Sequence, residues 1–213
     1  PFAGQPALFI RLKGCNLKCY FCDTEFDSGI EYPLDRLEDY VSKHLPICTA
    51  YIDERPLIVI TGGEPMLQAD LPLFIQRLIE NLRCRVQIET AGSVWQPGFD
   101  NLLEKYPNHI TIVVSPKTGD LHSKIHKFAD CYKYVIKAGC VGHDGLPIMS
   151  TQHPDKNTIL ARPIFSDNKL VYVMPMDEHD NIKNAANLQQ AADSAIRFGY
   201  ILCIQLHKLA GLE

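Results

Sequence analysis

The chain of 213 residues is long enough for one domain with a hydrophobic core, and 46% hydrophobic with 22% charged residues is typical of a soluble globular protein. There are 21 Lys and Arg against 25 Asp and Glu, a formal net charge of −4 with no basic run, which argues against a nucleic-acid or membrane-surface binder. Apolar runs such as 57–60 are too short to span a bilayer. No signal peptide is visible, and a start at Pro1 without Met suggests that upstream residues are missing. We expect a cytoplasmic protein.

Short apolar, β-branched runs alternate with helix-period segments along the chain. The expected strands are 8–12, 57–61, 86–90, 111–115, 132–136, 170–174 and 201–205. Most of them are nearly continuous apolar runs, as expected for parallel strands buried on both faces. The expected helices are 33–45, 69–82 and 181–198. This alternation predicts βαβ units, and hence a doubly wound sheet or a barrel.

One segment breaks the alternation. Residues 139–168 are rich in Gly, Pro, Asp, Asn and Ser and show no period. We expect a long excursion between two strands, either a lid or an inserted hairpin, within a single domain that spans residues 1–213.

Polar or glycine-rich residues follow six of the expected strands. They are Gly14-Cys15-Asn16, Gly62-Gly63-Glu64-Pro65, Glu89-Thr90-Ala91-Gly92, Ser115-Pro116-Lys117, Pro175-Met176-Asp177 and Gln205-Leu206-His207-Lys208. Each alone also fits a bland role, such as a turn or a solvated tail. Because the carboxyl ends of parallel strands share one rim, where α/β folds build active sites, their coincidence favours a functional site.

Three cysteines, Cys15, Cys19 and Cys22, lie within eight residues. Structural zinc normally takes four ligands, but His44 is inside an expected helix and Cys48 has no spacing signature. Three thiolates on a [4Fe–4S] cluster leave one iron open to a small molecule with an amine and a carboxylate, such as S-adenosylmethionine (SAM). We favour the cluster over zinc or a disulfide. The other cysteines, which we expect to be small buried hydrophobes, are Cys48, Cys84, Cys131, Cys140 and Cys203.

These motifs resemble those of a known family. The cysteine spacing, with Phe21 before the third cysteine, resembles the signature of the radical SAM superfamily, and Gly62-Gly63-Glu64-Pro65 resembles its second motif. The whole set, in order, is similar to the landmarks of the 7-carboxy-7-deazaguanine synthases of the queuosine pathway. The resemblance covers nearly the whole chain and implies a partial, open parallel β/α barrel of the radical SAM type.

The resemblance also implies the reaction. The reduced cluster cleaves SAM, hydrogen is abstracted from 6-carboxy-5,6,7,8-tetrahydropterin, and the ring contracts to 7-carboxy-7-deazaguanine with loss of ammonia. SAM is regenerated, and Mg²⁺ assists. The activity is that of a carbon–nitrogen lyase in 7-deazapurine biosynthesis. Because the cluster and SAM carry the chemistry, no catalytic side chain is implied.

Site roles follow from the resemblance by position. The cluster falls to Cys15, Cys19 and Cys22, and magnesium to Thr24. The SAM contacts are Phe21, Asp23, Gly63, Glu64, Gly92, Ser115, Lys117, Met174, Pro175, Met176 and Asp177. The substrate contacts are Arg11, Thr90, His207 and, if it ends the chain, the terminal carboxylate of Glu213. A guanidinium at Arg11 suits a substrate carboxylate.

Three departures from the family pattern stand out. A Gln-Gly-Glu-Gly-like substrate segment is not found before Pro1, Met174 stands where many relatives have Gln, and 139–168 is longer than in compact relatives. Two alternatives stay open: a glycyl-radical-enzyme activase, and a non-catalytic zinc or Fe–S module. The expected partners are the pterin, an electron donor such as flavodoxin or ferredoxin, and a second copy in a homodimer.

Overall fold

A single parallel sheet of seven strands organises the molecule. The computed structural model describes residues 1–22, 24–25, 27–46, 55–152, 159–164 and 168–211. The strands are β1 (Ala7–Leu12), β2 (Leu57–Gly62), β3 (Arg85–Thr90), β4 (Ile110–Val114), β5 (Cys131–Ile136), β6 (Leu170–Pro175) and β7 (Ile201–Leu202). They lie side by side in chain order, all parallel, and within the described residues no pairing joins β7 to β1. The sheet is therefore open, as expected for a partial β/α barrel.

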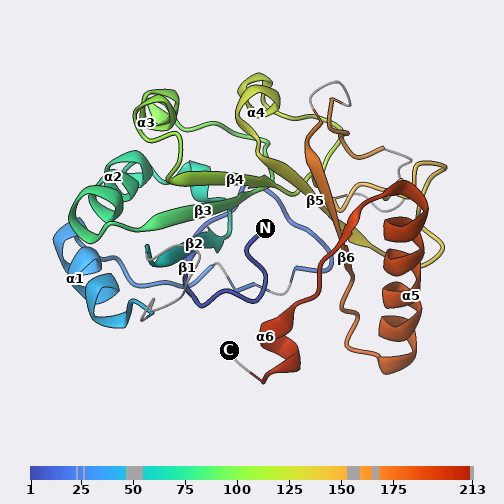
Figure 1. Ribbon diagram of the computed structural model, residues 1–213. Helices are drawn as coiled ribbons and strands as arrows, with labels where there is room; N and C mark the ends of the chain where they lie inside the picture. The colour runs from blue at the N-terminus through green and yellow to red at the C-terminus, as the bar shows by residue number, and fades with distance from the viewer. Residues whose placement is uncertain (23, 26, 47–54, 153–158, 165–167, 212–213) are drawn as a thin grey trace.

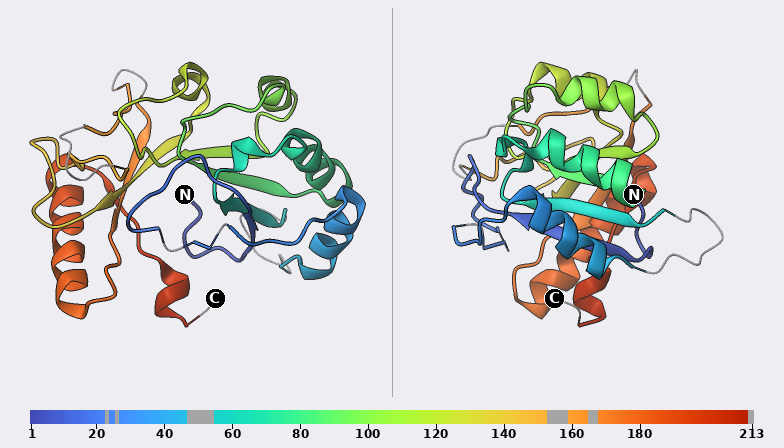
Figure 2. Two further views of the ribbon diagram at one scale, coloured as in Figure 1. Left: turned by 180° about the vertical axis from the view of Figure 1, so that it is seen from behind. Right: turned by 90° about the vertical axis from the view of Figure 1, so that its left-hand side faces the viewer.

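Helices form an outer layer around this curved sheet. They are α1 (Leu34–His44), α2 (Leu71–Leu82), α3 (Phe99–Lys105), α4 (Ser123–Phe128), α5 (Asn181–Phe198) and α6 (Leu206–Leu209), with a 3₁₀ turn η1 (Pro65–Leu67). Helices α1 to α5 cover the outer side, while the N-terminus and α6 lie on the inner side (Figure 1). Figure 2 shows from the side how α1 to α4 stack along one face. None of the described helices is both long and apolar enough to cross a membrane.

Local chemistry sets the ends of the longest helix, α5. The Asp180 carboxylate accepts the N–H groups of Ile182 and Lys183 at the first turn, which otherwise lack helical partners. Gly199 ends the helix in the left-handed region with φ of 73°. The sequence prediction of 181–198 is confirmed for this helix.

The two faces of the sheet differ in composition. Alternate strand residues, for example Ile60, Ile88 and Ile112, are fully buried in a core shared with the outer helices. On the inner face β3 and β5 instead carry polar groups, Glu89 and Lys133, which form an ion pair. These two strands therefore depart from the expected pattern of apolar burial on both faces.

The scattered cysteines are less uniform than expected. Cys84 and Cys131 are buried, but Cys140 and Cys203 are only half-buried. Cys48 lies outside the described residues. Among the described residues no two cysteines form a disulfide.

The excursion, residues 139–168 between β5 and β6, contains a small hairpin. Val141 and Pro147 form an antiparallel bridge, and the Gly142 N–H donates to the carbonyl of Leu146 at 2.8 Å. The Arg162 guanidinium binds the Asp144 carboxylate at 2.7 Å. The excursion is thus tied to itself by an ion pair as well as by the bridge.

Candidate active site at the rim of the sheet

The carboxyl ends of the strands form one rim. In register, Leu12 pairs with Gly62, Thr90 with Val114, and Ile136 with Pro175. Since each of these pairs lies at or beside a strand end, the segments that follow leave the sheet along the same edge. The structure therefore brings the six polar signatures to one rim, as their positions after the strands predicted.

The glycine pair after β2 holds the cysteine loop, residues 13–22, against the sheet. The Gly63 N–H donates to the carbonyl of Leu12 at 2.9 Å. A Cβ added at Gly62 would lie 2.2 Å from the Leu12 nitrogen, and one at Gly63 would lie 1.8 Å from the Gly14 oxygen. No side chain fits at either position, so the pair exists for a close approach of two backbones rather than for a simple turn.

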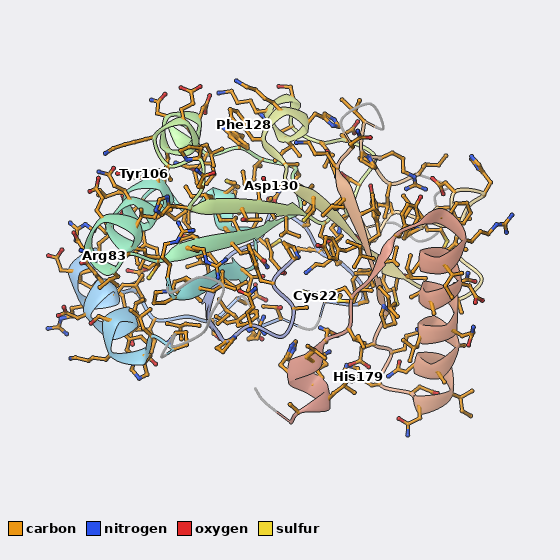
Figure 3. All side chains as sticks on the ribbon, viewed as in Figure 1. Cys22, Arg83, Tyr106, Phe128, Asp130 and His179 are labelled. Carbon is orange, nitrogen blue, oxygen red and sulfur yellow. The ribbon has the colours of Figure 1, made fainter. Side chains whose placement is uncertain are left out.

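The three thiols sit on successive turns of this loop. The Leu17 N–H donates to Cys15 Sγ at 3.4 Å, and the Cys22 N–H donates to the carbonyl of Cys19 at 3.1 Å. Cys22 Sγ contacts the Thr24 carbonyl at 3.6 Å. Burial raises the pKa of the Cys15 thiol, and the Leu17 N–H opposes this. Cys22 lies near the middle of Figure 3, away from Arg83 and Tyr106 among the outer helices.

This loop fits a cluster better than a single ion. Among the described residues no three His, Cys, Asp or Glu side chains converge closely enough to hold one metal ion. A [4Fe–4S] cluster binds each thiolate at a different iron, so its cysteines need not converge on a point. Three free thiols on one loop, with hydrogen-bond donors directed at two of them, suit that chemistry.

Glu64 joins the ends of β2 and β3. Its buried carboxylate accepts the Thr90 hydroxyl at 2.7 Å, the Ala91 N–H at 2.8 Å and the Met66 N–H at 3.1 Å. Burial raises the pKa of Glu64, while these hydrogen bonds lower it. Thr90 also accepts the Gly92 N–H at 3.0 Å. One lone pair of the Thr90 hydroxyl is left for a donor in the site.

Lys117 supplies a positive charge beside the cysteine loop. Its ammonium donates to the backbone oxygen of Ser115 at 2.8 Å and to the Ser115 hydroxyl. Burial lowers the pKa of Lys117 to about 8, and the nearby Cys19 opposes this shift. With a pKa of about 8 the ammonium is mostly protonated at neutral pH, and a bound anion would stabilise its charge further.

A pocket opens between the cysteine loop, the ends of β4 to β6 and the excursion. Three of the expected SAM residues line it: Phe21, Lys117 and Met176. Tyr20 and Met149, which the sequence did not single out, line it as well. Seven expected SAM residues do not line it: Gly63, Glu64, Gly92, Ser115, Met174, Pro175 and Asp177. Asp23 and Glu213 lie outside the described residues.

Two of the substrate residues expected from the sequence, Arg11 and His207, lie on the inner side of the sheet, whereas Thr90 is buried on the same side of β3 as Ile88. Arg11 is exposed at the end of β1, on the same face as Phe9. The Phe9 ring lies 6.4 Å from the ring of His207 in α6. Lys208 binds the Asp177 carboxylate at 2.9 Å and so holds α6 to the end of β6. The structure thus places the sequence-distant Arg11 and His207 at the same side of the site.

A partly buried ion pair on the inner face was missed by the sequence analysis. Lys133 on β5 binds Glu89 on β3 at 2.8 Å, and the Gln87 amide donates to Glu89 at 3.0 Å. Burial opposes the charge of Glu89, but Lys133 lowers the pKa of this carboxyl, and Glu89 raises that of Lys133. The only sequence signal is that Gln87 and Glu89 are two positions apart on one strand and so lie on the same face of the sheet.

Asn187, buried in α5, was also missed. Its carbonyl accepts the Ala138 N–H at 2.8 Å, and its amide donates to the carbonyl of Met176 at 3.0 Å and to Glu178 at 3.0 Å. It therefore ties the segments that leave β5 and β6, one of which carries the pocket residue Met176. A polar side chain in an amphipathic helix gives no local signal of such a role.

Two residues of the excursion touch the cysteine loop. Cys19 Sγ lies 3.2 Å from the Thr151 hydroxyl and 3.1 Å from the Gln152 amide nitrogen. These contacts join residues more than 130 positions apart. No sequence pattern pointed to them.

Comparisons with known proteins show the family to which the chain belongs. The family model described as "Radical SAM superfamily" matches residues 9–139. The 7-carboxy-7-deazaguanine synthase of Rhodospirillum rubrum is 42% identical to this chain, over 98% of this chain and 85% of that protein. The protein of the same name in Rickettsia prowazekii is 33% identical, over 100% of this chain and 82% of that protein.

Solved structures share the fold. The crystal structure of QueE from Escherichia coli has a TM-score of 0.59 at 20% identity, covering 96% of this chain and 87% of that one. The crystal structure of Streptococcus suis SuiB has a TM-score of 0.52 at 15% identity, over 93% of this chain and 48% of that one. At these identities the likeness concerns the fold alone.

Proposed function

We infer the function from the family. The chain belongs to the radical SAM superfamily and, within it, to the 7-carboxy-7-deazaguanine synthase family. It converts 6-carboxy-5,6,7,8-tetrahydropterin to 7-carboxy-7-deazaguanine with loss of ammonia. One observation carries this inference. The cysteine loop, the pocket beside it and the inner-face pair Arg11 and His207 occupy one rim of the same sheet.

The cysteine loop would hold the [4Fe–4S] cluster through Cys15, Cys19 and Cys22. When bound, the reduced cluster and SAM supply the one-electron chemistry that removes hydrogen from the substrate. The glycine pair keeps the loop that would hold the cluster close to the end of β2. Lys117 would bind the carboxylate of SAM, because its ammonium suits that group.

The pocket lined by Phe21, Lys117 and Met176 would receive SAM. Glu64, bound to Thr90 and Ala91, holds the neighbouring strand ends in place and keeps one acceptor position for an amine. Six other expected SAM residues, which do not line the pocket, belong to this proposal as well: Gly63, Gly92, Ser115, Met174, Pro175 and Asp177. Asp23, which lies outside the described residues, also remains part of the proposal.

On the inner face, Arg11 would bind the substrate carboxylate through its guanidinium fork. His207 and the free lone pair of Thr90 would contact the ring, and the terminal carboxylate of Glu213 its guanidine-like edge. Thr24 would offer an oxygen to Mg²⁺, which keeps several waters and takes few protein ligands. This modest demand fits a single hydroxyl on the loop.

The wider setting is also proposed here. A low-potential donor such as flavodoxin or ferredoxin would reduce the cluster, and the protein would act in the cytoplasm as a homodimer, within one domain.

Anaerobic reconstitution followed by a product assay tests this function. We expect about four irons per chain and formation of 7-carboxy-7-deazaguanine from the pterin with SAM, reductant and Mg²⁺. Deoxyadenosine without any deazaguanine would reject this substrate while leaving the superfamily assignment in place. Radical transfer to a partner enzyme instead would favour an activase, and a colourless zinc protein would reject both.

A further inference from the structure

The excursion reaches back across the rim to the cysteine loop. The Tyr20 N–H donates to the carbonyl of Thr151 at 3.3 Å, and the Lys18 N–H donates to Gln152 Oε1 at 2.6 Å. These two bonds flank Cys19 on both sides. Residues 150–152 therefore hold the part of the loop that carries Cys19 through hydrogen bonds on both sides of it.

This segment is itself firmly held. The Ser150 hydroxyl and the Thr151 N–H both donate to the carbonyl of Lys117 at 3.2 Å. Farther along, the Ala161 N–H donates to the carbonyl of Thr118 at 2.8 Å, and the Tyr134 hydroxyl from β5 donates to the carbonyl of Ala161 at 2.6 Å. Ser150 and Thr151 are buried. The segment that contacts Cys19 is thus hydrogen-bonded to residues that follow β4 and, farther along, to β5.

Hydrogen bonding fixes which atom of Gln152 faces the cysteine. The Lys18 N–H can only donate, so the atom that it meets must be the oxygen Oε1. The amide nitrogen Nε2 is then directed at Cys19 Sγ, 3.1 Å away, and at Thr151 Oγ1, also 3.1 Å away. Both amide protons have an acceptor, and one of these is the sulfur.

The Thr151 hydroxyl is available to the same sulfur. It lies 3.2 Å from both Cys19 Sγ and the carbonyl of Lys117. That carbonyl has two lone pairs and already accepts from Ser150 and from the Thr151 N–H. The hydroxyl proton is therefore free to go to Cys19 when the cysteine is an acceptor-only thiolate.

We propose that Gln152 and Thr151 are positioning residues that hold Cys19 as a cluster ligand and raise the reduction potential of the cluster. The inference rests on the proposed function, because it needs a cluster on Cys15, Cys19 and Cys22. Reduction adds one electron from the external low-potential donor and increases the negative charge on the sulfurs. Donors aimed at a sulfur stabilise that reduced form more than the oxidised one.

Three variants test this inference, with the midpoint potential measured by an EPR-monitored redox titration of reconstituted protein. Gln152→Leu removes both amide donors and should lower the ratio of reduced to oxidised cluster roughly tenfold at fixed solution potential, a shift of about 59 mV to more negative values. Gln152→Glu keeps an acceptor for Lys18 but faces Cys19 with a carboxylate, so it should shift the potential at least as far. Thr151→Val should shift it less, in the same direction.

Gln189→Leu is the matched control, because Gln189 is exposed on α5, far from the cysteine loop in sequence, and its amide donates to Asp193 of the same helix at 2.9 Å. Its potential should equal that of the wild type. If Gln152→Leu fails to take up iron, Gln152→Glu and Thr151→Val decide the question. Wild-type potentials in the fully loaded Gln152 and Thr151 variants would overturn the inference. Wild-type protein that takes up no cluster would instead contradict the proposed function.

Discussion

The outer and inner faces of the sheet are made from alternate residues of the same strands, yet they are filled in different ways. Ile88 and Ile112 on the outer face are packed among helices with no exposed surface. Glu89, which follows Ile88 on β3, faces the inner side, as do residues such as Arg11 on β1. Because side chains alternate between the two faces, a single strand can place apolar residues in the core and polar residues in the site.

The largest effect should come from the rim, at the cluster ligand Cys19. We expect Cys19→Ala to abolish SAM cleavage, because a cluster that loses one of its three thiolates is no longer held. The loop lies outside the core, so the thermal unfolding midpoint of the metal-free protein should change little. Full activity in this variant would end the cluster assignment.

Gly63→Ala should reduce SAM cleavage almost as much as Cys19→Ala does, for a purely steric reason. The added Cβ would lie 1.8 Å from the Gly14 oxygen, so the cysteine loop must move and iron content should fall sharply. Gly98→Ala is the control: its φ of 82° makes alanine strained, by roughly 1 kcal/mol, but no atom lies within 4 Å. Iron analysis of both proteins should show normal loading in the control alone.

On the inner face, Lys133→Met should lower the free energy of unfolding by about 1–3 kcal/mol at pH 7, since it leaves the partly buried Glu89 carboxylate without its partner. Denaturant titration would measure this. The double variant Glu89→Gln with Lys133→Met should recover most of the loss, and a double variant as unstable as the single one would contradict the pairing argument.

The pH dependence gives the sign of the same interaction. In the wild type the pKa of Glu89 is lowered, so its stabilising contribution is present above the unfolded pKa and is lost as pH falls through the folded one. In Lys133→Met the unpaired carboxyl should have a raised pKa. The deficit relative to the wild type should therefore shrink as the solution is acidified.

The smallest effect should come from the outer face. Ile112→Val removes one buried methylene, and we expect a loss of about 0.5–1.5 kcal/mol of unfolding free energy. The activity of the folded fraction should not change, because this side chain faces the helices. A clear change in the affinity for substrate would break the separation of the two faces.

The sequence predicted the framework better than the contacts. The seven strands and the three helices α1, α2 and α5 follow from apolar periodicity, although β7 ends at Leu202 rather than at residue 205. Helices α3, α4 and α6 were missed, because segments of 7, 6 and 4 residues are too short to show a helical period.

The site was predicted from motifs next to strand ends, and the structure brings these motifs to one rim, while the binding roles of their residues stay predictions. Cys15 and Gly63 are examples. The contacts of Gln152 with Cys19 and of Lys133 with Glu89 join residues 133 and 44 positions apart, and only tertiary packing determines them. No pattern in a single sequence carries that information.

The most direct test of the central claim is the stoichiometry of the reaction of the reconstituted wild-type protein with 6-carboxy-5,6,7,8-tetrahydropterin. We predict one ammonia for each 7-carboxy-7-deazaguanine formed, with SAM not consumed over many turnovers. SAM consumption with deoxyadenosine as product, and neither ammonia nor the deazaguanine, would contradict the account.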